Sequence, residues 1–265
     1  MLEFPVSRID VSTGTIEHRR DFVAEEKPLH IFLNQNHYVT ILSSPRQLRE
    51  LAVGHLLSEG ILQSPREIQQ VELQKDGKCT VKLHPDVDIK KRIELARPFA
   101  RLFVSACGSP NYWPLSKLID RLELQKQPTH LRMRAETVWR AVKQLNTLAK
   151  TFRKTGAVHI AALHSATGEL MTFSEDVGRH NAADKVIGAG ALKECNFSKC
   201  FLASSGRLTG DIVLKAARMR IPIVASIAAA VDSGIDVAQR TGITLIGFVR
   251  GKRMNVYTHA ERIEP

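Results

Sequence analysis

The first part of the chain alternates apolar and polar residues in the way that is typical of half-exposed strands. Segments 29–33 and 39–41 alternate on either side of a short polar turn, which predicts a β-hairpin. Segments 71–73 and 80–83 do the same around Asp76-Gly77, a strong turn signal, and predict a second hairpin. This part of the chain should therefore be rich in β-structure.

A helix is expected between the two hairpins. Ser44 is a good capping residue, Pro45 suits the first helical position, and Gln47 would complete a capping box. Gly60 should end this helix, because glycine readily adopts the backbone conformation that follows a last helical turn.

The periodicity fades between Ser105 and Gln127, where glycine and proline residues gather, and this stretch is the expected domain junction. A chain of 265 residues with 43% hydrophobic residues can bury one large core or two smaller ones. We favour two unequal domains, residues 1–125 and residues 126–265.

Strands and helices alternate after the junction. Strands are expected at 158–163, 169–173, 200–204, 222–227 and 243–249, and helices at 134–153, 178–192, 211–219 and 233–240. Such alternation implies a sheet covered on both faces, with a further hairpin at 249–254. The expected fold class is α/β, with a smaller N-terminal β-rich α+β domain and a C-terminal α/β domain.

The charge of the chain is strongly positive, with 38 Lys and Arg against 27 Asp and Glu and a net charge of +11. Such a surface attracts anions and acidic partners. Seven basic residues fall between Arg132 and Lys154, around an apolar helical stripe formed by Val138, Val142, Leu145, Ala149 and Phe152. We interpret them as the solvated face of a helix. A nucleic-acid surface is a weaker hypothesis, because no aromatic residues are interleaved for stacking on bases.

The densest polar segment runs from Ser174 to Lys185, where a strand is followed by a helix start. Free N–H groups and the positive end of the helix dipole could bind an anion there, assisted by Arg179 and His180. His180 and Asp184 should share a helix face. Two alternatives remain open, namely Asp176 as a helix cap with Arg179 paired to Glu175, and a metal site built from Asp176, His180 and Asp184.

Two further segments are candidate anion sites. The loop that contains Ser205 and Gly206 joins a strand to a helix and could cradle a phosphate, although an ordinary turn capped by Thr209 or Asp211 fits equally well. The segment 248–253 places an aromatic residue and three cations at a hairpin tip, which suits a pyrophosphate and a flat heterocycle. The members of this tip that we single out are Phe248, Arg250, Gly251, Lys252 and Arg253. A solvent-exposed basic turn is the alternative.

Four cysteines are too few and too scattered for a disulfide framework, and no pair has zinc-ligand spacing, so we assign no metal. Cys107 lies among small residues that would leave its thiol accessible, which makes it a candidate nucleophile. Cys79 and Cys200 fall in apolar strands and should be buried. The first residues lack the features of a signal peptide, and no apolar segment is long enough to span a membrane, so we expect a cytoplasmic protein.

The segment Ser174–Lys185 resembles the signature of the formate dehydrogenase accessory sulfurtransferases, the FdhD family. Five other segments resemble the same family in the same order: 25–29, 54–61, 215–222, 242–248 and 253–259. The resemblance covers nearly the whole chain. It implies a cytidine-deaminase-like three-layer α/β/α fold for the C-terminal domain.

The resemblance also implies a function. Cys107 matches the first cysteine of a Cys-Gly-x-Cys motif, whose thiolate would take sulfur from a cysteine desulfurase as a persulfide. The sulfur would pass to a molybdenum or tungsten bis(molybdopterin guanine dinucleotide) cofactor, bound at 248–253, before its insertion into formate dehydrogenase. We also expect a homodimer.

This chain departs from the motif at its second cysteine, which is replaced by Pro110. A second thiol could expel the sulfur by forming a disulfide, and proline cannot. Either Cys107 delivers sulfur alone, or the protein is a non-catalytic cofactor-binding chaperone. A nucleotide-binding or nucleic-acid-binding protein is a third hypothesis. An active zinc deaminase is disfavoured, because its His-x-Glu and Pro-Cys-x-x-Cys motifs are missing.

Overall fold

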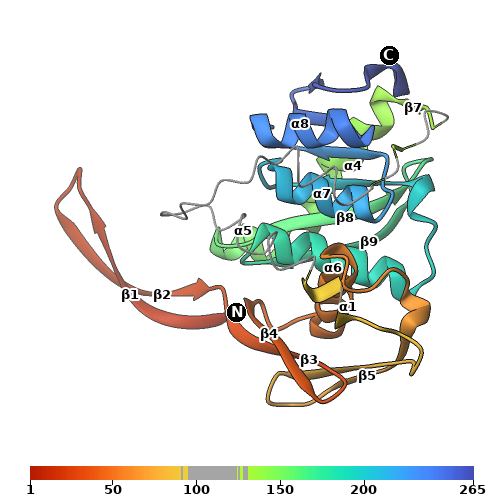
Figure 1. The fold of residues 1–265 in the computed structure, drawn as a ribbon. Coiled ribbons are helices and arrows are strands. Elements are labelled where there is room, and N and C mark those ends of the chain that lie inside the picture. Colours follow the sequence, from red (N-terminus) through yellow and green to blue (C-terminus); the bar gives the residue numbers. More distant parts are fainter. Residues whose placement is uncertain (91, 95–123, 125, 128–130) are drawn as a thin grey trace, which may run out of the picture.

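The computed structural model describes residues 1–90, 92–94, 124, 126–127 and 131–265. A long hairpin leads into a four-stranded sheet with one helix, which packs on a larger six-stranded sheet flanked by helices (Figure 1). This mixed architecture, β-rich at the N-terminal end and α/β at the C-terminal end, confirms the predicted fold class.

The small sheet consists of both predicted hairpins. Its strands are β3 (Lys27–Leu33), β4 (Asn36–Ser43), β5 (Ile68–Leu73) and β6 (Lys78–Leu83), in the order β4-β3-β6-β5. The hairpins pair antiparallel within themselves, and β3 runs parallel to β6 between them. Leu29, Ile31 and Leu33 are buried as their alternation predicts.

The helix between the hairpins, α1 (Leu48–Ser58), begins three residues later than predicted. The capping box was wrong, because Gln47 has a left-handed backbone with φ of 53° and Ser44 contacts a distant strand instead. The Ser44 hydroxyl accepts a hydrogen bond from the amide of Val177 at 3.2 Å. Ser44 therefore makes a tertiary contact in place of the helix cap that the local pattern predicts.

The large sheet has the strand order β13-β12-β11-β10-β8-β9. Its strands are β8 (His159–Ser165), β9 (Leu170–Asp176), β10 (Cys200–Ser204), β11 (Ile223–Ser226), β12 (Thr244–Arg250) and β13 (Arg253–Val256). The strands β10, β11 and β12 are parallel, and the outer ones are antiparallel to their neighbours.

Helices cover both faces of this sheet, as the alternating pattern predicts. One face packs against α6 (Arg179–Leu192), α7 (Gly210–Arg218) and α8 (Asp232–Thr241), and the other against α4 (Ala135–Leu148). The region is thus three layers deep. A small parallel pair, β7 (Met133–Arg134) and β14 (Ile263–Glu264), ties the end of the chain to the start of α4.

The single helix predicted at 134–153 is wrong in one respect, because the structure breaks it at Ala149. There the backbone has ψ of 65°, and a short helix, α5 (Lys150–Thr155), follows. The apolar stripe packs on the sheet up to Ala149, but Phe152 is 49% exposed because α5 turns away. All seven basic residues of this stretch are exposed, in agreement with a solvated face.

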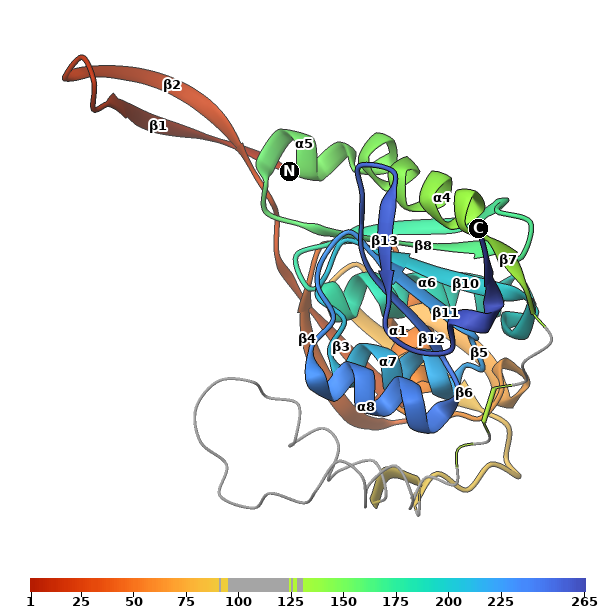
Figure 2. The ribbon, with the colours of Figure 1, turned by 90° about the horizontal axis from the view of Figure 1, so that it is seen from above.

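The sequence analysis did not predict the first element, a hairpin of β1 (Leu2–Asp10) and β2 (Thr15–Val23). Its strands pair antiparallel along their full length, from Leu2 opposite Val23 to Asp10 opposite Thr15. Figures 1 and 2 show it projecting from the body as an arm. We call residues 1–23 the arm.

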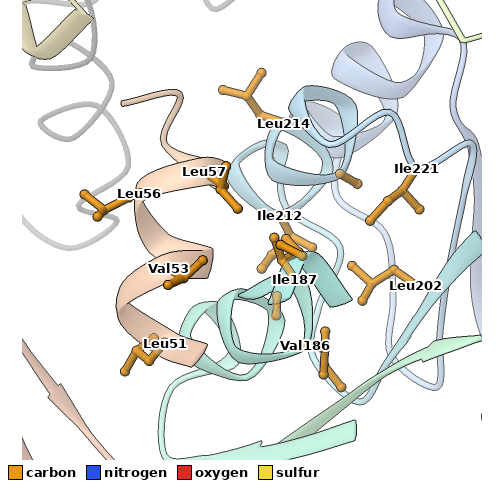
Figure 3. Packing of buried hydrophobic residues seen from close by; sticks show 14 of the residues in the cluster. Leu51, Val53, Leu56, Leu57, Val186, Ile187, Leu202, Ile212, Leu214 and Ile221 are labelled. Carbon is orange, nitrogen blue, oxygen red and sulfur yellow. The ribbon is translucent and has the colours of Figure 1, made fainter. Parts of the chain in front are cut away.

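One continuous core joins the two sheets through α1. Side chains of the small sheet, of α1, of α6 and α7 and of the large sheet belong to a single buried cluster. Figure 3 shows its part between α1, α6 and α7. A second cluster lies beneath α4. The predicted boundary at residue 125 falls beside residues outside the described part of the chain, and it stays a prediction.

Helices α1 and α6 cross in direct backbone contact. A Cβ atom on Gly54 would lie 1.7 Å from the carbonyl oxygen of Asp184, and one on Gly188 would lie 1.9 Å from that of Glu50. Any larger residue would collide with backbone, which cannot move aside as a side chain can. These two glycines therefore set the distance between the helices.

We predict that Gly188→Ala destabilises the protein by more than about 3 kcal/mol, because the two helices must separate and open the core between them. Urea denaturation followed by circular dichroism measures the loss. Gly190→Ala is the matched control on the same helix, since its Cβ would meet only the side chains of Leu163 and Phe197. An equal loss in both variants would contradict the backbone-contact explanation.

Candidate functional site

The candidate residues for anion binding lie at one edge of the large sheet. The parallel strands β10, β11 and β12 all end there, and the loop at Ser205, the start of α6 and the hairpin tip at 248–253 follow from strand ends on this edge. Ligands of α/β sheets commonly bind outside the carboxyl ends of parallel strands. We call this the carboxyl edge.

The start of α6 has free N–H groups, as the sequence predicts for an anion site. Gly178 occupies the N-cap position and offers no side chain to cap the helix. Asp176 is not the cap, because its Oδ1 accepts hydrogen bonds from the amide of Gly178 and the side chain of Asn181, both at 2.9 Å. The dipole of α6 is therefore not neutralised by a carboxylate at its first turn.

Arg179 lies against the Ser205–Gly206 loop. A Cβ on Gly206 would be 2.9 Å from the Cβ of Arg179, so only glycine leaves room for this side chain. The Nε atom of Arg179 is buried and has no partner in the described part of the chain. The proposed pair with Glu175 was wrong, because that carboxylate accepts the amides of Thr151 and Phe152 at the start of α5.

His180 contacts α7 through Asp211. Its Nε2 atom pairs with Oδ2 of Asp211, whose other oxygen accepts the hydroxyl of Thr209. Burial alone would raise the pKa of Asp211, but these contacts and the amide of Ile212 lower it to about 2. Asp211 is thus a stable anion that holds the imidazole in place, and His180 remains 32% exposed at its side chain.

Two residues that the sequence analysis missed complete this cluster, His159 and Arg207. The hydroxyl of Ser205 accepts the amide of Ile160 at 3.0 Å and lies 3.4 Å from Nδ1 of His159. Burial lowers the pKa of His159, and the positive charges of Arg179 and Arg207 lower it further. His159 reaches the cluster because β8 pairs with β10, so no local signal could have found it, whereas Arg207 directly follows Gly206 in the candidate loop.

A chain of hydrogen bonds connects the Ser205 loop to the hairpin tip. The hydroxyl of Ser226 donates to the carbonyl of Gly206 at 2.7 Å and accepts the amide of Ala228 at 3.0 Å. The carbonyl of Ala228 in turn accepts the amide of Phe248 at 3.0 Å. The two predicted anion sites therefore belong to one connected edge.

The hairpin tip itself is exposed at Arg250, Gly251, Lys252 and Arg253. The guanidinium of Arg250 stacks 5.1 Å from the ring centre of Phe248. Phe248 and Lys252 both have positive φ, 52° and 57°, and the strand register shifts between Gly247 and Arg250. The irregular backbone turns an aromatic ring and cations outward, where a flat, anionic ligand could reach them.

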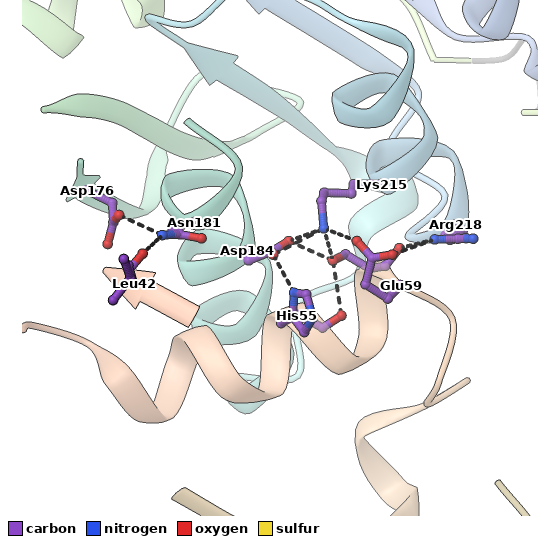
Figure 4. Close-up of polar contacts among 9 residues, drawn as sticks. Leu42, His55, Glu59, Asp176, Asn181, Asp184, Lys215 and Arg218 are labelled. Atoms are coloured by element: carbon purple, nitrogen blue, oxygen red, sulfur yellow. Dashed lines mark hydrogen bonds and ion pairs between the residues drawn. The ribbon is translucent and has the colours of Figure 1, made fainter. Parts of the chain in front are cut away.

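The other half of the polar run is structural. Lys185 and Asp176 are fully buried and form an ion pair at 2.6 Å, and Lys185 also donates to the carbonyl of Ser44 at 2.9 Å. Asn181 donates to the carbonyl of Leu42 at 2.8 Å (Figure 4). These contacts tie the end of β4 to the start of α6.

Asp184 and Lys215 form a second buried tie, between α6 and α7. Nζ of Lys215 lies 3.0 Å from Asp184 and 2.5 Å from Glu59 at the end of α1, and Asp184 also accepts the hydroxyl of Ser58 at 2.6 Å (Figure 4). His180 and Asp184 share a helix face as predicted, and each pairs with a residue of α7. Burial opposes the charge on Asp184, but Lys215 and the nearby His55 hold its pKa well below its usual range.

These pairings leave no metal site at the polar run. Asp176, His180 and Asp184 each contact a different partner, and the described residues contain no group of three His, Cys, Asp or Glu that could hold a metal ion. None of the described helices is long and apolar enough to cross a membrane.

The thiols differ in burial. Cys79 and Cys200 are buried as predicted, and burial raises the pKa of each to about 11. Cys195 is half-buried. Cys107 and Pro110 lie outside the described residues, so the candidate nucleophile has no structural description.

A hollow among the described residues lies away from the carboxyl edge. It has a volume of about 1250 Å³ and is bordered by Arg66, Arg92, Cys195 and Leu124. None of the candidate site residues lines it.

Comparison with known proteins identifies the family. The model of the FdhD/NarQ family matches residues 24–264. This chain belongs to the FdhD/NarQ family. The match begins where the arm ends and includes both sheets, the two buried ties and the carboxyl edge.

Relatives and a solved structure agree with this assignment. The sulfur carrier protein FdhD of Methanothermobacter thermautotrophicus is 36% identical over 93% of this chain and 94% of the relative. That of Sulfolobus acidocaldarius is 34% identical over 96% of each chain. A formate dehydrogenase accessory protein from Desulfotalea psychrophila has a similar structure, with a TM-score of 0.78, 25% identity and 99% of each chain covered.

We predict that Asp184→Asn destabilises this FdhD/NarQ protein by about 3–5 kcal/mol at pH 7, because it leaves Lys215 buried with one carboxylate fewer. The lowered pKa of Asp184 means that its contribution is complete above about pH 4 and is lost as the pH falls further. Urea denaturation at pH 7, 5 and 3 should therefore show a difference from wild type that narrows only at pH 3.

Asp236→Asn is the matched control, since Asp236 forms an exposed pair with Arg240 at 3.0 Å. Its loss should stay below about 1 kcal/mol at every pH. Similar losses in the free energy of unfolding of both variants would mean that the buried pair of Asp184 and Lys215 stabilises the protein no more than a surface ion pair does.

Proposed function

We propose that this protein carries sulfur for the maturation of formate dehydrogenase. The observation that carries the proposal is the agreement of nearly the whole chain with relatives named sulfur carrier protein FdhD, at 32–36% identity. The positively charged carboxyl edge supports it, because the chemistry needs a site for a large anionic cofactor.

The sulfur would travel as a persulfide on Cys107. The Cys107 thiolate would attack the terminal sulfur of a persulfide on a cysteine desulfurase, forming one S–S bond while the desulfurase thiolate leaves. The buried thiols Cys79 and Cys200 are poor competitors, because raised pKa values leave little thiolate at neutral pH.

The acceptor would be a molybdenum or tungsten bis(molybdopterin guanine dinucleotide), which is cargo here. Phe248 would stack on a guanine or pterin ring, and Arg250, Lys252 and Arg253 would meet its phosphates, with Gly251 allowing the tight turn. Arg179, His180, Ser205 and Gly206 would form a second phosphate site at the start of α6.

We place the protein in the cytoplasm, with a cysteine desulfurase and formate dehydrogenase as partners and a second copy of itself. Nucleic acid is not a proposed partner, because the basic residues at 132–154 lie on the solvent-facing surface of α4 and α5, as in an ordinary solvated helix. Pro110 favours one competing function, a cofactor-binding chaperone that no longer transfers sulfur.

We predict that Cys107 reacts with iodoacetamide much faster than Cys79 and Cys200, because they are buried and weakly ionised. After incubation with a desulfurase and cysteine, the intact mass should rise by one sulfur atom, and a reductant should reverse the gain. Cys107→Ala should abolish both the gain and the rescue of formate dehydrogenase activity in cells that lack the protein.

Cys195→Ala is the control, since Cys195 is half-buried after the end of α6 and lies outside the motif that contains Cys107. Full rescue by Cys107→Ala would establish the chaperone function and reject sulfur transfer. A mass gain that persists in Cys107→Ala and disappears in Cys195→Ala would show that Cys195 carries the persulfide, and it would contradict our proposal.

We predict that Arg179→Ala weakens the binding of guanosine diphosphate by about 1.5–3 kcal/mol, the typical contribution of a hydrogen bond to a charged group. Isothermal titration calorimetry measures the loss. Arg140→Ala removes the same charge from the outer face of α4, where Arg140 pairs only with Glu136, and should leave affinity unchanged. Equal affinity in both variants would exclude Arg179 from the nucleotide site.

A further inference from the structure

The hollow away from the carboxyl edge lies where three helices end. The ends of α1, α6 and α7 border it, and each helix is followed there by a residue with a left-handed backbone, Gly60, Glu194 and Arg220 respectively. Such a position favours glycine, and a larger residue in it is strained. Two of the three helices nevertheless place a charged residue there, which indicates a role for this surface beyond ending the helices.

The hollow is large enough to hold part of another protein. Its volume of about 1250 Å³ exceeds the roughly 300–1000 Å³ of pockets that hold small molecules. Leu57 and Leu62 are buried in its wall, and Leu124, Phe197 and Met219 are partly buried there against the main core. An apolar side chain of a partner that entered among them would lose contact with water, which favours association.

The charges of the lining favour an acidic partner. Its described residues include four arginines and two glutamates, namely Arg66, Arg92, Arg218, Arg220, Glu59 and Glu194. The carboxylate of Glu59 is already held by Lys215 at 2.5 Å and Arg218 at 3.7 Å (Figure 4). Arg218 also donates to the carbonyl of Ser58 at 2.8 Å, which offsets the negative end of the α1 dipole. The excess of arginine therefore leaves the hollow positive.

Arg66 and Arg220 are the exposed arginines of this lining, and Glu194 is its exposed acid. Among the described contacts, Arg66 donates a hydrogen bond only through its backbone amide, to the hydroxyl of Ser64 at 3.2 Å. Its guanidinium is therefore available to a carboxylate of a partner, and it can bind both oxygens at once.

The place of the hollow along the chain links it to Cys107. The described chain reaches Glu94 and resumes at Leu124, and Cys107 belongs to the stretch between them. Arg92 and Leu124, on either side of that stretch, both line the hollow. The donor of sulfur must bring its persulfide to Cys107, so a docking surface beside both attachment points suits it. No residue of the carboxyl edge lines the hollow, so donor and cofactor can bind at the same time.

We propose that this hollow is the docking site of the cysteine desulfurase, which inserts an acidic segment with an apolar side chain between the ends of α1, α6 and α7. The inference rests on the desulfurase as sulfur donor in the proposed function, and it adds where the donor binds and which chemistry it presents. Docking holds the two reacting chains together and so favours the exchange. The exchange itself is unchanged, since the Cys107 thiolate takes the terminal sulfur and the desulfurase thiolate leaves.

Binding of a purified cysteine desulfurase to the full-length protein, measured by biolayer interferometry, tests the proposal. The double variant Arg66→Glu, Arg220→Glu should raise the dissociation constant by about tenfold or more, because it opposes an acidic segment with two new carboxylates. Arg66→Glu alone changes a side chain with no described hydrogen bond and should raise it by about threefold, which keeps the test valid if the double variant does not fold. The matched control, Arg140→Glu with Lys143→Glu, changes the net charge equally on the outer face of α4 and should bind like wild type.

Sulfur transfer, measured as intact mass over time, separates docking from the carrier function. The double variant should take sulfur from the desulfurase with a raised KM and an unchanged kcat, because only binding is weakened. It should take sulfur from glutathione persulfide, which needs no docking site, at the wild-type rate. A wild type that neither binds the desulfurase nor gains sulfur from it would reject the proposed function and this inference together.

Three other results would overturn the docking site alone. One is wild-type affinity for the desulfurase in both hollow variants while the wild type still gains sulfur. Another is an equal loss of affinity in the α4 control, which would show that general charge attraction and not the hollow sets the binding. The third is a double variant that binds the desulfurase normally and no longer binds formate dehydrogenase, which would assign the hollow to that partner.

Discussion

The close crossing of α1 and α6 is the constraint on which the rest of the structure depends. Gly54 and Gly188 let the two backbones touch, and this contact joins the small sheet to the large one. Because no side chain separates the helices, the position of α6 is fixed by backbone atoms, which hardly yield. The positions of the groups at the start of α6, including those at the carboxyl edge, are therefore fixed by the same contact.

The buried ion pairs follow from this crossing. Once α1 lies on α6, the polar groups of Asp176, Asp184 and Lys185 are enclosed, and charges in an apolar interior must be paired or pay a large desolvation cost. Lys215 supplies the partner on α7 and also reaches Glu59 at the end of α1. Three helices are thereby locked together by one ammonium group. The pairing specifies their arrangement more than it adds stability, since an apolar replacement of equal volume could pack as well.

Local patterns were sufficient for most elements of this fold. Alternation located both hairpins of the small sheet, and the helix–strand alternation after residue 134 located the large sheet and its helices. Failures occurred where a distant contact prevailed over a local signal. Ser44 accepts a hydrogen bond from Val177, just after β9, and does not cap its own helix. Helix α4 ends before Ala149 although the apolar spacing continues to Phe152.

The candidate site shows the same limit. The sequence indicated the start of α6, the Ser205 loop and the hairpin tip, because each is a strand end rich in small or charged residues. It could not indicate His159, which reaches the edge through the pairing of β8 with β10. Nor could the sequence show that Asp176 and Asp184 are structural while Arg179 and His180 lie at the candidate site. The two aspartates pair with Lys185 and Lys215, and these pairings depend on how the helices pack.

The arm was missed for a different reason. Its strands interleave charged and apolar residues without the clean alternation that one buried face imposes, and the chain itself supplies nothing to bury. Alternation identifies a strand only where one of its faces is buried, so an exposed hairpin lacks that signal.

The polar run also explains how the carboxyl edge stays positive. Asp176 and Asp184 are drawn inward and neutralised by buried lysines, so they do not oppose an anion at the start of α6. The carboxylate of Asp211 lies near the start of α6, and it forms a pair with the imidazole of His180. Arg179 and Arg207, whose charges both act on His159, have no ion pair with an acidic residue among the described contacts. The same packing that fixes α6 therefore creates the local excess of positive charge that a phosphate-bearing cargo requires.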